Sequence, residues 1–321
     1  MYYKQRGSTK TIRDLHRSFN KKLHLPQLQK IFICPSHECN ANCVHCYEKY
    51  KNKKSDFLET KTVKNIINQF QHLGGDLIYF CSGEFLLRKD ALELIQFASH
   101  KKINVSVASN GLLIDENKIK ELKEAGITTL LISIDSANEE RHDDLRKVKG
   151  CFRKAINALE LAHKYNIKTE VWTYITKTNY NELEGIASLA KQVHSSVVFV
   201  FYPLLSGNLY ERFDENLTFE EREAFRKRFN GKDPVLLEFP TESSHCRGGG
   251  NEHVCVMPSG DVTFCPPVPY SYGNVHDNSL KNILKIVVED YNKFCTKECT
   301  GQCIVNFEEY RKNCNAKFIY N

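Results

Sequence analysis

The chain has 321 residues, of which 41% are hydrophobic and 26% charged, and its formal net charge is +6. This length is enough to bury a large core, and the composition is that of a globular protein rather than a disordered or fibrous one. The longest apolar run, about ten residues around Ser196–Leu205, is too short to cross a bilayer, and no apolar stretch follows the basic N-terminus. The sequence therefore predicts a cytoplasmic protein without a signal peptide.

Positive charge is concentrated near the N-terminus. Residues 1–30 contain eight Lys or Arg and one acid, Asp14, and a second basic run spans residues 49–54. Such runs are usually solvated faces or flexible arms, and a surface for an acidic peptide or a nucleic acid is the alternative. We interpret residues 1–29 as a basic arm.

From residue 30 the hydrophobic pattern predicts strands that alternate with helices. The predicted strands are Lys30–Cys34, Leu77–Cys81, Asn104–Ala108, Thr129–Ile134, Lys168–Ile175 and Val197–Tyr202. The predicted helices are Thr60–Leu73, Asp90–His100, Asp115–Ala125, Cys151–Tyr165, Asn181–Val193 and Phe219–Phe229. Thr60 is expected to cap the first helix and Gly126 to end the third.

This alternation predicts an α/β fold, in which a parallel sheet is covered by helices and curves into a full or partial barrel. In such a fold the active site lies at the carboxyl ends of the strands. We assign residues 30–240 to this core domain.

Residues 241–321 have a different character, with seven cysteines and little alternation. Short strands Val254–Pro258 and Val262–Cys265 flank a predicted turn at Ser259-Gly260, and Ser279–Phe294 is a predicted helix. A segment with so few apolar residues needs a metal to hold a fold, so we assign it to a second, metal-binding domain.

The chain has thirteen cysteines, an odd number that cannot pair completely. In a reducing compartment clustered cysteines are metal ligands or redox groups. Cys39-x3-Cys43-x2-Cys46 lies in the loop after the first strand. Three thiolates can hold three irons of a cubane and leave the fourth iron open for a ligand. Cys34 as a fourth ligand, and a zinc site that uses His37 and His45, are the alternatives.

The segment CNANCVHC resembles the signature of the radical S-adenosylmethionine (SAM) enzymes. Further motifs follow in that family's order at the ends of the next strands, and the resemblance covers about residues 30–210. These motifs are Cys81-Ser82-Gly83-Glu84, Ser109-Asn110-Gly111, Ser133-Ile134-Asp135-Ser136, His142-Asp143 with Arg146, and Gly150-Cys151-Phe152. The resemblance implies a partial (β/α)6 TIM-type barrel.

The resemblance also implies a [4Fe–4S] cluster with an open site on Cys39, Cys43 and Cys46, and SAM as its ligand. Glu84 and backbone around Gly83 are expected to bind the SAM amine, and Arg146 the carboxylate. The other implied cofactor-binding residues are Asn110, Ser133, Asp135 and the main chain at Tyr47. Ser82 and Phe85 depart from the family, which has glycine and proline at these positions.

The C-terminal cysteines resemble those of the SPASM and twitch domains, which hold auxiliary iron–sulfur clusters. The matching features are Cys246-x13-Gly260-x4-Cys265 and a tail with Cys295, Cys299, Cys303 and Cys314. One or two auxiliary [4Fe–4S] clusters are therefore expected, with these six cysteines as ligands. Cys255 is a ligand, a buried thiol or a hydrogen-atom donor, and we predict that it is catalytic.

This layout is typical of enzymes that modify peptides. The sequence therefore predicts a radical SAM maturase that acts on a peptide, by forming a thioether or carbon–carbon link, by epimerisation or by oxidation. The expected electron donor is a flavodoxin- or ferredoxin-type protein, and no membrane partner is expected. A small-molecule dehydrogenase or epimerase of a sugar or cyclitol is the second hypothesis. A non-catalytic, metal-stabilised nucleic-acid-binding protein is the third, and nucleic acid is the less favoured partner.

Overall fold

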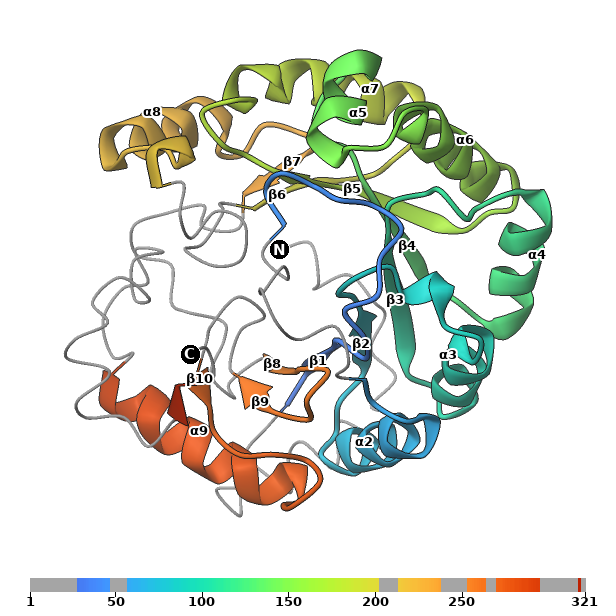
Figure 1. Ribbon diagram of the computed structural model, residues 1–321, viewed down its shortest axis with the longest axis vertical. Helices are drawn as coiled ribbons and strands as arrows, with labels where there is room; N and C mark the ends of the chain where they lie inside the picture. The colour runs from blue at the N-terminus through green and yellow to red at the C-terminus, as the bar shows by residue number, and fades with distance from the viewer. Residues whose placement is uncertain are drawn as a thin grey trace.

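The computed structural model describes residues 28–46, 57–201, 213–237, 253–263, 270–294 and 317–318. These residues form a curved, open sheet of nine strands with helices around its outside (Figure 1). The strands are β1 (Lys30–Ile33), β2 (Leu77–Phe80), β3 (Asn104–Ser109), β4 (Thr129–Ser133), β5 (Lys168–Tyr174), β6 (Val198–Phe201), β7 (Val235–Leu237), β8 (His253–Val256) and β9 (Val262–Thr263). Two further strands, β10 (Tyr270–Ser271) and β11 (Lys317–Phe318), form a separate antiparallel pair.

The described helices are α2 (Thr60–His72), α3 (Ala91–His100), α4 (Glu116–Ala125), α5 (Glu139–Arg146), α6 (Cys151–Lys164), α7 (Leu183–Gln192), α8 (Phe219–Phe229) and α9 (Leu280–Phe294). All the helices and strands expected in the core are present, within a few residues of the predicted bounds. Helix α5 and strand β7 were not expected. None of the described helices is long and apolar enough to span a bilayer.

The strand order is β7-β6-β5-β4-β3-β2-β1-β8-β9. Every neighbouring pair from β7 to β8 is parallel, and only β8 and β9 are antiparallel. The first six strands therefore lie side by side in chain order, and their carboxyl ends meet at one end of the barrel. This confirms the predicted partial barrel.

The hairpin of β8 and β9 was expected in the C-terminal region, and it adds to the same sheet. Val254 is in register with Ile31 of β1, and the amide of Cys34 donates to the Val256 carbonyl at 2.8 Å. Without β8, strand β1 would leave unpaired backbone groups at the edge of the sheet. The polypeptide after residue 240 thus contributes directly to the barrel.

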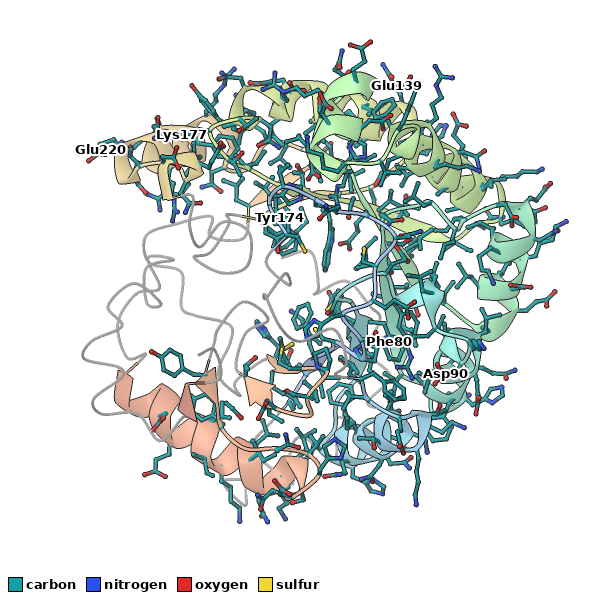
Figure 2. The ribbon with its side chains drawn as sticks, viewed as in Figure 1. Phe80, Asp90, Glu139, Tyr174, Lys177 and Glu220 are labelled. Atoms are coloured by element: carbon teal, nitrogen blue, oxygen red, sulfur yellow. The ribbon has the colours of Figure 1, made fainter. Side chains whose placement is uncertain are left out.

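The two faces of the sheet carry different side chains, because successive residues of a strand point to opposite faces. Ile31, Ile33, Ile78 and Phe80 belong to the large apolar core shared with the helices. Phe32 packs instead in a second buried cluster on the inner face, with Cys34, Cys81, Cys255 and Met257. In Figure 2, Tyr174 at the end of β5 lies inside the barrel, whereas Glu139 and Glu220 lie at the outer rim.

Local sequence explains most helix ends. Gly126 ends α4 in the left-handed conformation with φ of 88°, as predicted. The prediction that Thr60 caps α2 was wrong, because Glu59 is the N-cap and the Thr60 hydroxyl donates to Asp90 Oδ2 at 2.6 Å. The hydroxyl of Thr60 instead makes a tertiary contact with the residue that precedes the next helix, which the local sequence around Thr60 does not indicate.

Gly111, which ends the motif after β3, provides a test of this packing. Its φ is +84°, and an added Cβ would lie 2.8 Å from the backbone Cα of Ala155 in α6. We expect Gly111→Ala to lower the free energy of unfolding by roughly 2–4 kcal/mol, because backbone strain and a clash with backbone add together. Urea unfolding followed by circular dichroism measures this.

Gly150→Ala is the matched control. Gly150 has a similar φ of +81°, but nothing lies within 4 Å of the position of an added Cβ. This variant should lose only about 1 kcal/mol, the cost of the left-handed conformation. Equal losses in the two variants would contradict the predicted clash.

Candidate active site

The loop that carries Cys39, Cys43 and Cys46 follows β1 at the carboxyl end of the barrel. Cys39 is exposed, Cys43 is buried and Cys46 is partly buried. The amides of Asn42 and Val44 donate to the carbonyls of Arg146 and Leu145, at 3.2 and 2.9 Å. Both neighbours of Cys43 are therefore fixed to the last turn of α5. Partial desolvation of the Cys39 sulfur raises its pKa, although the residue as a whole is exposed and the Ala41 amide, which donates to the sulfur at 3.4 Å, opposes the rise.

Gly83 brings the end of β2 against this loop. The amide of Glu84 donates to the Glu38 carbonyl at 2.8 Å. A Cβ on Gly83 would lie 2.2 Å from that same carbonyl oxygen, and the φ of Gly83 is +55°. Only glycine permits this approach. Ser82, where the family has glycine, also takes a positive φ of 75°, and its hydroxyl donates to the Ser36 carbonyl at 3.2 Å.

The carboxylate of Glu84 is buried and accepts three hydrogen bonds. Its Oε1 accepts from the Leu86 amide at 3.3 Å, and its Oε2 accepts from the Ser109 hydroxyl at 3.1 Å and the Asn110 amide at 2.8 Å. Burial raises the pKa of Glu84 to about 7, against the effect of these bonds. Glu84 thus joins β2 to the end of β3.

Asn110 connects β3 to the cysteine loop. Its side-chain amide donates to Asn40 Oδ1 at 2.7 Å, and its own Oδ1 accepts from the Leu112 amide at 3.0 Å. Asn40 was not predicted as a site residue. Its position between the first two cysteines of the loop was the available signal.

Asp135, just after β4, is fully buried and is the centre of a polar network. Its Oδ2 lies 2.6 Å from Arg146 Nη2 and 3.4 Å from His45 Nε2, and its Oδ1 accepts from the Tyr174 amide at 3.1 Å. Burial opposes ionisation, but Arg146 and the histidines hold the pKa of Asp135 below its ordinary value. Ser133 is the last residue of β4, in register with Trp172.

Two buried histidines flank Asp135. The Asp135 amide donates to His142 Nδ1 at 3.2 Å, and the His45 ring stacks on Tyr174 with centroids 5.5 Å apart. Burial lowers the pKa of each histidine to about 4, so both are neutral at pH 7. Asn179, which the sequence gave no reason to select, donates to the Asp135 carbonyl at 2.8 Å.

Arg146 ends α5 and is only 8% exposed. Besides the Asp135 contact, its Nη1 lies 3.6 Å from Cys43 Sγ. Its Nε has no hydrogen-bond partner within the described part of the chain, although it is buried. The structure therefore brings Glu84, Asn110, Asp135 and Arg146 around one cysteine loop.

The family model of the radical SAM superfamily matches residues 33–193, which is half of the chain. The chain belongs to the radical SAM superfamily. Members of this superfamily are enzymes, so the hypothesis of a non-catalytic nucleic-acid-binding protein is set aside.

Curated relatives and solved structures extend this result. The chain is 30% identical to an Fe-coproporphyrin III synthase of Methanosarcina barkeri over 65% of this chain and 54% of that protein. It is 24% identical to a PqqA peptide cyclase of Gluconobacter oxydans over 78% of this chain and 75% of that protein. The chain spans about half the length of the first curated relatives it matches.

Streptococcus suis SuiB in complex with SAM has the same fold. Its TM-score is 0.72 at 15% identity, over 88% of this chain and 72% of that chain. SuiB has also been solved with its precursor peptide SuiA, with a TM-score of 0.69 and 14% identity, over 88% of this chain and 71% of that chain. At this level of identity the likeness shows the radical SAM fold.

Other predicted site residues of this radical SAM protein fall elsewhere. Tyr47, Cys246, Cys265, Cys295, Cys299, Cys303 and Cys314 lie outside the described residues. Cys255 of β8 is fully buried in the barrel, with its sulfur 3.4 Å from Cys34 Sγ and 3.7 Å from Met257 Sδ. Cys34 in turn lies 3.5 Å from Cys81 Sγ. Three neighbouring strands thus place three thiols in contact, beside the segment that leads to Glu84.

The raised pKa of Glu84 leads to a prediction about stability. The folded state binds the Glu84 proton more tightly than the unfolded state, so its ionisation destabilises the fold as pH rises from about 4.5 to about 7. We expect Glu84→Gln to raise the free energy of unfolding at pH 8 by about 1–2 kcal/mol. Removing the ionisation of a carboxyl group with this pKa shift is worth roughly 3 kcal/mol, and part of that gain is lost because an amide has one hydrogen-bond acceptor oxygen where the carboxylate has two. Urea unfolding of the apoprotein at pH 8 and pH 4.5 measures this.

At pH 4.5 the gain should disappear, because the wild-type carboxyl is then protonated in the folded state. The surface variant Glu121→Gln, which loses an exposed pair with Lys118, is the control and should show no such pH dependence. A gain of the same size at both pH values, or a loss at pH 8, would contradict the prediction.

Proposed function

We propose that this enzyme reductively cleaves SAM to the 5′-deoxyadenosyl radical and uses hydrogen abstraction to modify a peptide. The observation that carries the first part is the meeting of the cysteine loop, Glu84 and Arg146 at the carboxyl end of one barrel. The second part, the substrate, is supported by the names of relatives.

Cys39, Cys43 and Cys46 are the residues that would hold a [4Fe–4S] cluster in this proposal. Within the described residues no three His, Cys, Asp or Glu side chains converge as the ligands of a single metal ion would. The chemistry of the donor set fits a cluster, because three thiols on one loop bind three separate irons and leave one iron without a protein ligand. Bound there, the cluster supplies one electron and an open coordination site for SAM. The protein fixes the loop through the carbonyls of α5 and surrounds it with buried side chains.

The residues predicted to bind SAM offer groups of the required kinds. Glu84, as carboxylate, has further lone pairs for an ammonium group, and Arg146 Nε is a buried donor without a described partner that suits a carboxylate. Ser133 is the last residue of β4 and Asp135 follows this strand, both at this end of the barrel. We keep Asn110, Gly83 and the main chain at Tyr47 in the proposed binding site.

The proposal also includes one or two auxiliary [4Fe–4S] clusters on Cys246, Cys265, Cys295, Cys299, Cys303 and Cys314, in a C-terminal domain of residues 241–321. The catalytic role of Cys255 stays a prediction. Cys255 contacts the thiol of Cys34, which in turn contacts Cys81; Cys255 and Cys34 are fully buried, and Cys81 is 5% exposed.

A peptide is the favoured substrate because relatives named for peptide chemistry match most of the chain. The PqqA peptide cyclase relative covers 78% of it, and the SuiB structure with its precursor peptide covers 88%. The second candidate is a small-molecule substrate. The relative named as an Fe-coproporphyrin III synthase favours it, and would make the substrate a tetrapyrrole precursor of that product rather than the sugar or cyclitol expected from sequence. In both cases the proposed electron donor is a flavodoxin or ferredoxin, and the proposed location is the cytoplasm.

Cleavage of SAM is the direct test of the first part. The full-length protein, reconstituted with iron and sulfide without oxygen and then reduced with dithionite, should convert SAM to 5′-deoxyadenosine, measured by liquid chromatography. Changing Cys39, Cys43 or Cys46 to alanine should reduce this product at least 100-fold, because each removes a ligand of the cluster.

Arg141→Gln is the control, since Arg141 is exposed, pairs with Glu182 and lies outside the proposed site. Variants of Cys295, Cys299 and Cys303 should lose iron and keep uncoupled cleavage. Iron-loaded protein that never yields 5′-deoxyadenosine would refute the proposal, and so would purified protein that carries only zinc.

The substrate class is tested separately. If a short open reading frame lies beside the gene, the peptide that it encodes is co-expressed with the enzyme. A crosslink or an oxidation should lower the mass of the peptide by a loss of hydrogen, which mass spectrometry detects. Epimerisation should leave the mass unchanged and invert a stereocentre, which chiral amino-acid analysis detects. The Cys43→Ala enzyme should leave the peptide unmodified. Formation of Fe-coproporphyrin III from a tetrapyrrole precursor, with every neighbouring peptide unchanged, would establish the small-molecule candidate instead.

A further inference from the structure

The guanidinium of Arg146 lies between a predicted cluster ligand and a buried carboxylate. Its Nη1 is 3.6 Å from Cys43 Sγ, and its Nη2 is 2.6 Å from Asp135 Oδ2. Arg146 and Cys43 are each 8% exposed, and Asp135 is fully buried. Charges interact strongly where so little water reaches them. The two ends of one guanidinium therefore affect the thiolate and the carboxylate together.

The backbone holds this arrangement in place. The carbonyls of Leu145 and Arg146 accept from the amides of Val44 and Asn42, on either side of Cys43. At its start, α5 is capped by Asn138, whose Oδ1 accepts from the Arg141 amide at 2.9 Å. The turn that carries Arg146 is thus attached to the loop that carries Cys43. The side chain of Arg146 is further held by its ion pair with the fully buried Asp135.

The other groups around Arg146 do not replace its charge. His45 Nε2 lies 3.4 Å from Asp135 Oδ2, and His142 Nδ1 accepts from the Asp135 amide, whereas the permanently charged Arg146 guanidinium lies closer to Asp135, at 2.6 Å. Glu84 and Cys151 also act on Arg146 electrostatically, and neither adds positive charge. Within the described part of this network, Arg146 supplies the positive charge and Asp135 the matching negative one.

A positive hydrogen-bond donor at a cluster sulfur favours the reduced, more negative state of the cluster. We propose that Arg146 is a positioning residue that raises the reduction potential of the cluster through Cys43, and that Asp135 limits this rise. The inference rests on the proposed function for the presence of a cluster. It adds a role that the sequence did not indicate, because there Arg146 was expected only at the SAM carboxylate.

Removing the charge of Arg146 and removing the charge of Asp135 should shift the midpoint potential of the cluster in opposite directions. Arg146→Gln removes the positive charge, so the cluster becomes harder to reduce. When the Arg146→Gln variant is held at the midpoint potential of the wild-type cluster, we expect its ratio of reduced to oxidised cluster to be about tenfold lower than in the wild type. For a one-electron couple, this corresponds to a shift of the midpoint potential by about 59 mV in the negative direction. Asp135→Asn removes the negative charge and should move the midpoint potential in the positive direction.

The experiment is a potentiometric titration of the reconstituted, full-length protein, followed by electron paramagnetic resonance without SAM. Omitting SAM separates this role from any contact of Arg146 with the SAM carboxylate. The matched control is Arg141→Gln, on the same helix, where Arg141 is exposed and pairs with Glu182. It should keep the wild-type midpoint potential. Iron and sulfide content show that each variant holds its cluster.

Each outcome decides the proposal. An Arg146→Gln protein with a full cluster and an unchanged potential would overturn it. If Arg146→Gln holds no cluster, Asp135→Asn decides, since a positive shift supports the proposal and no shift overturns it. Loss of the cluster in both variants, with retention in Arg141→Gln, would show a purely structural role. A wild-type protein without any cluster would refute the proposed function itself, which is a distinguishable result.

Discussion

Parallel pairing of β1 to β6 in chain order is the constraint on which the site depends. Because every strand runs in the same direction, each strand ends at the same rim of the barrel, and the residues just after the strands meet there. Glu84, Asn110 and Asp135 follow three successive strands, and the cysteine loop follows β1. Residues nearly 100 positions apart in sequence are thereby brought into hydrogen-bonding distance without any long-range sequence signal.

Burying charged groups at the carboxyl ends of the strands costs free energy, and Asp135 and Glu84 respond to burial in different ways. Asp135 remains ionised because Arg146 is its direct partner, and removing either member alone would leave an uncompensated buried charge. Glu84 has no cation in hydrogen-bonding contact in the described structure, so burial makes its carboxylate weakly acidic. A cationic ligand would change that balance, which fits a site prepared for an ammonium group.

The C-terminal part of the chain is joined more closely to the barrel than its composition suggests. Strand β8 continues the parallel sheet beyond β1 and brings Cys255 to Cys34 on the inner face. The apolar side chains of β8, Val254 and Val256, pack in the main core with those of α9, such as Leu284. A change in the C-terminal region can therefore act on β1, and through it on the start of the cysteine loop.

By itself, the sequence determined the α/β class, the order and approximate bounds of the core strands and helices, and the cysteine loop, because hydrophobic period and ligand spacing are local properties. Its motifs also selected Glu84, Asn110, Asp135 and Arg146, which the fold brings together. Only the tertiary structure decided that β8 pairs with β1, that Thr60 contacts Asp90 instead of capping its helix, and that Asn40 and Asn179 complete the network. It also decided that Arg146 reaches Cys43 and Asp135 at once. These contacts join residues far apart in the chain, so their geometry depends on how strands and helices pack and leaves no periodic mark in the sequence.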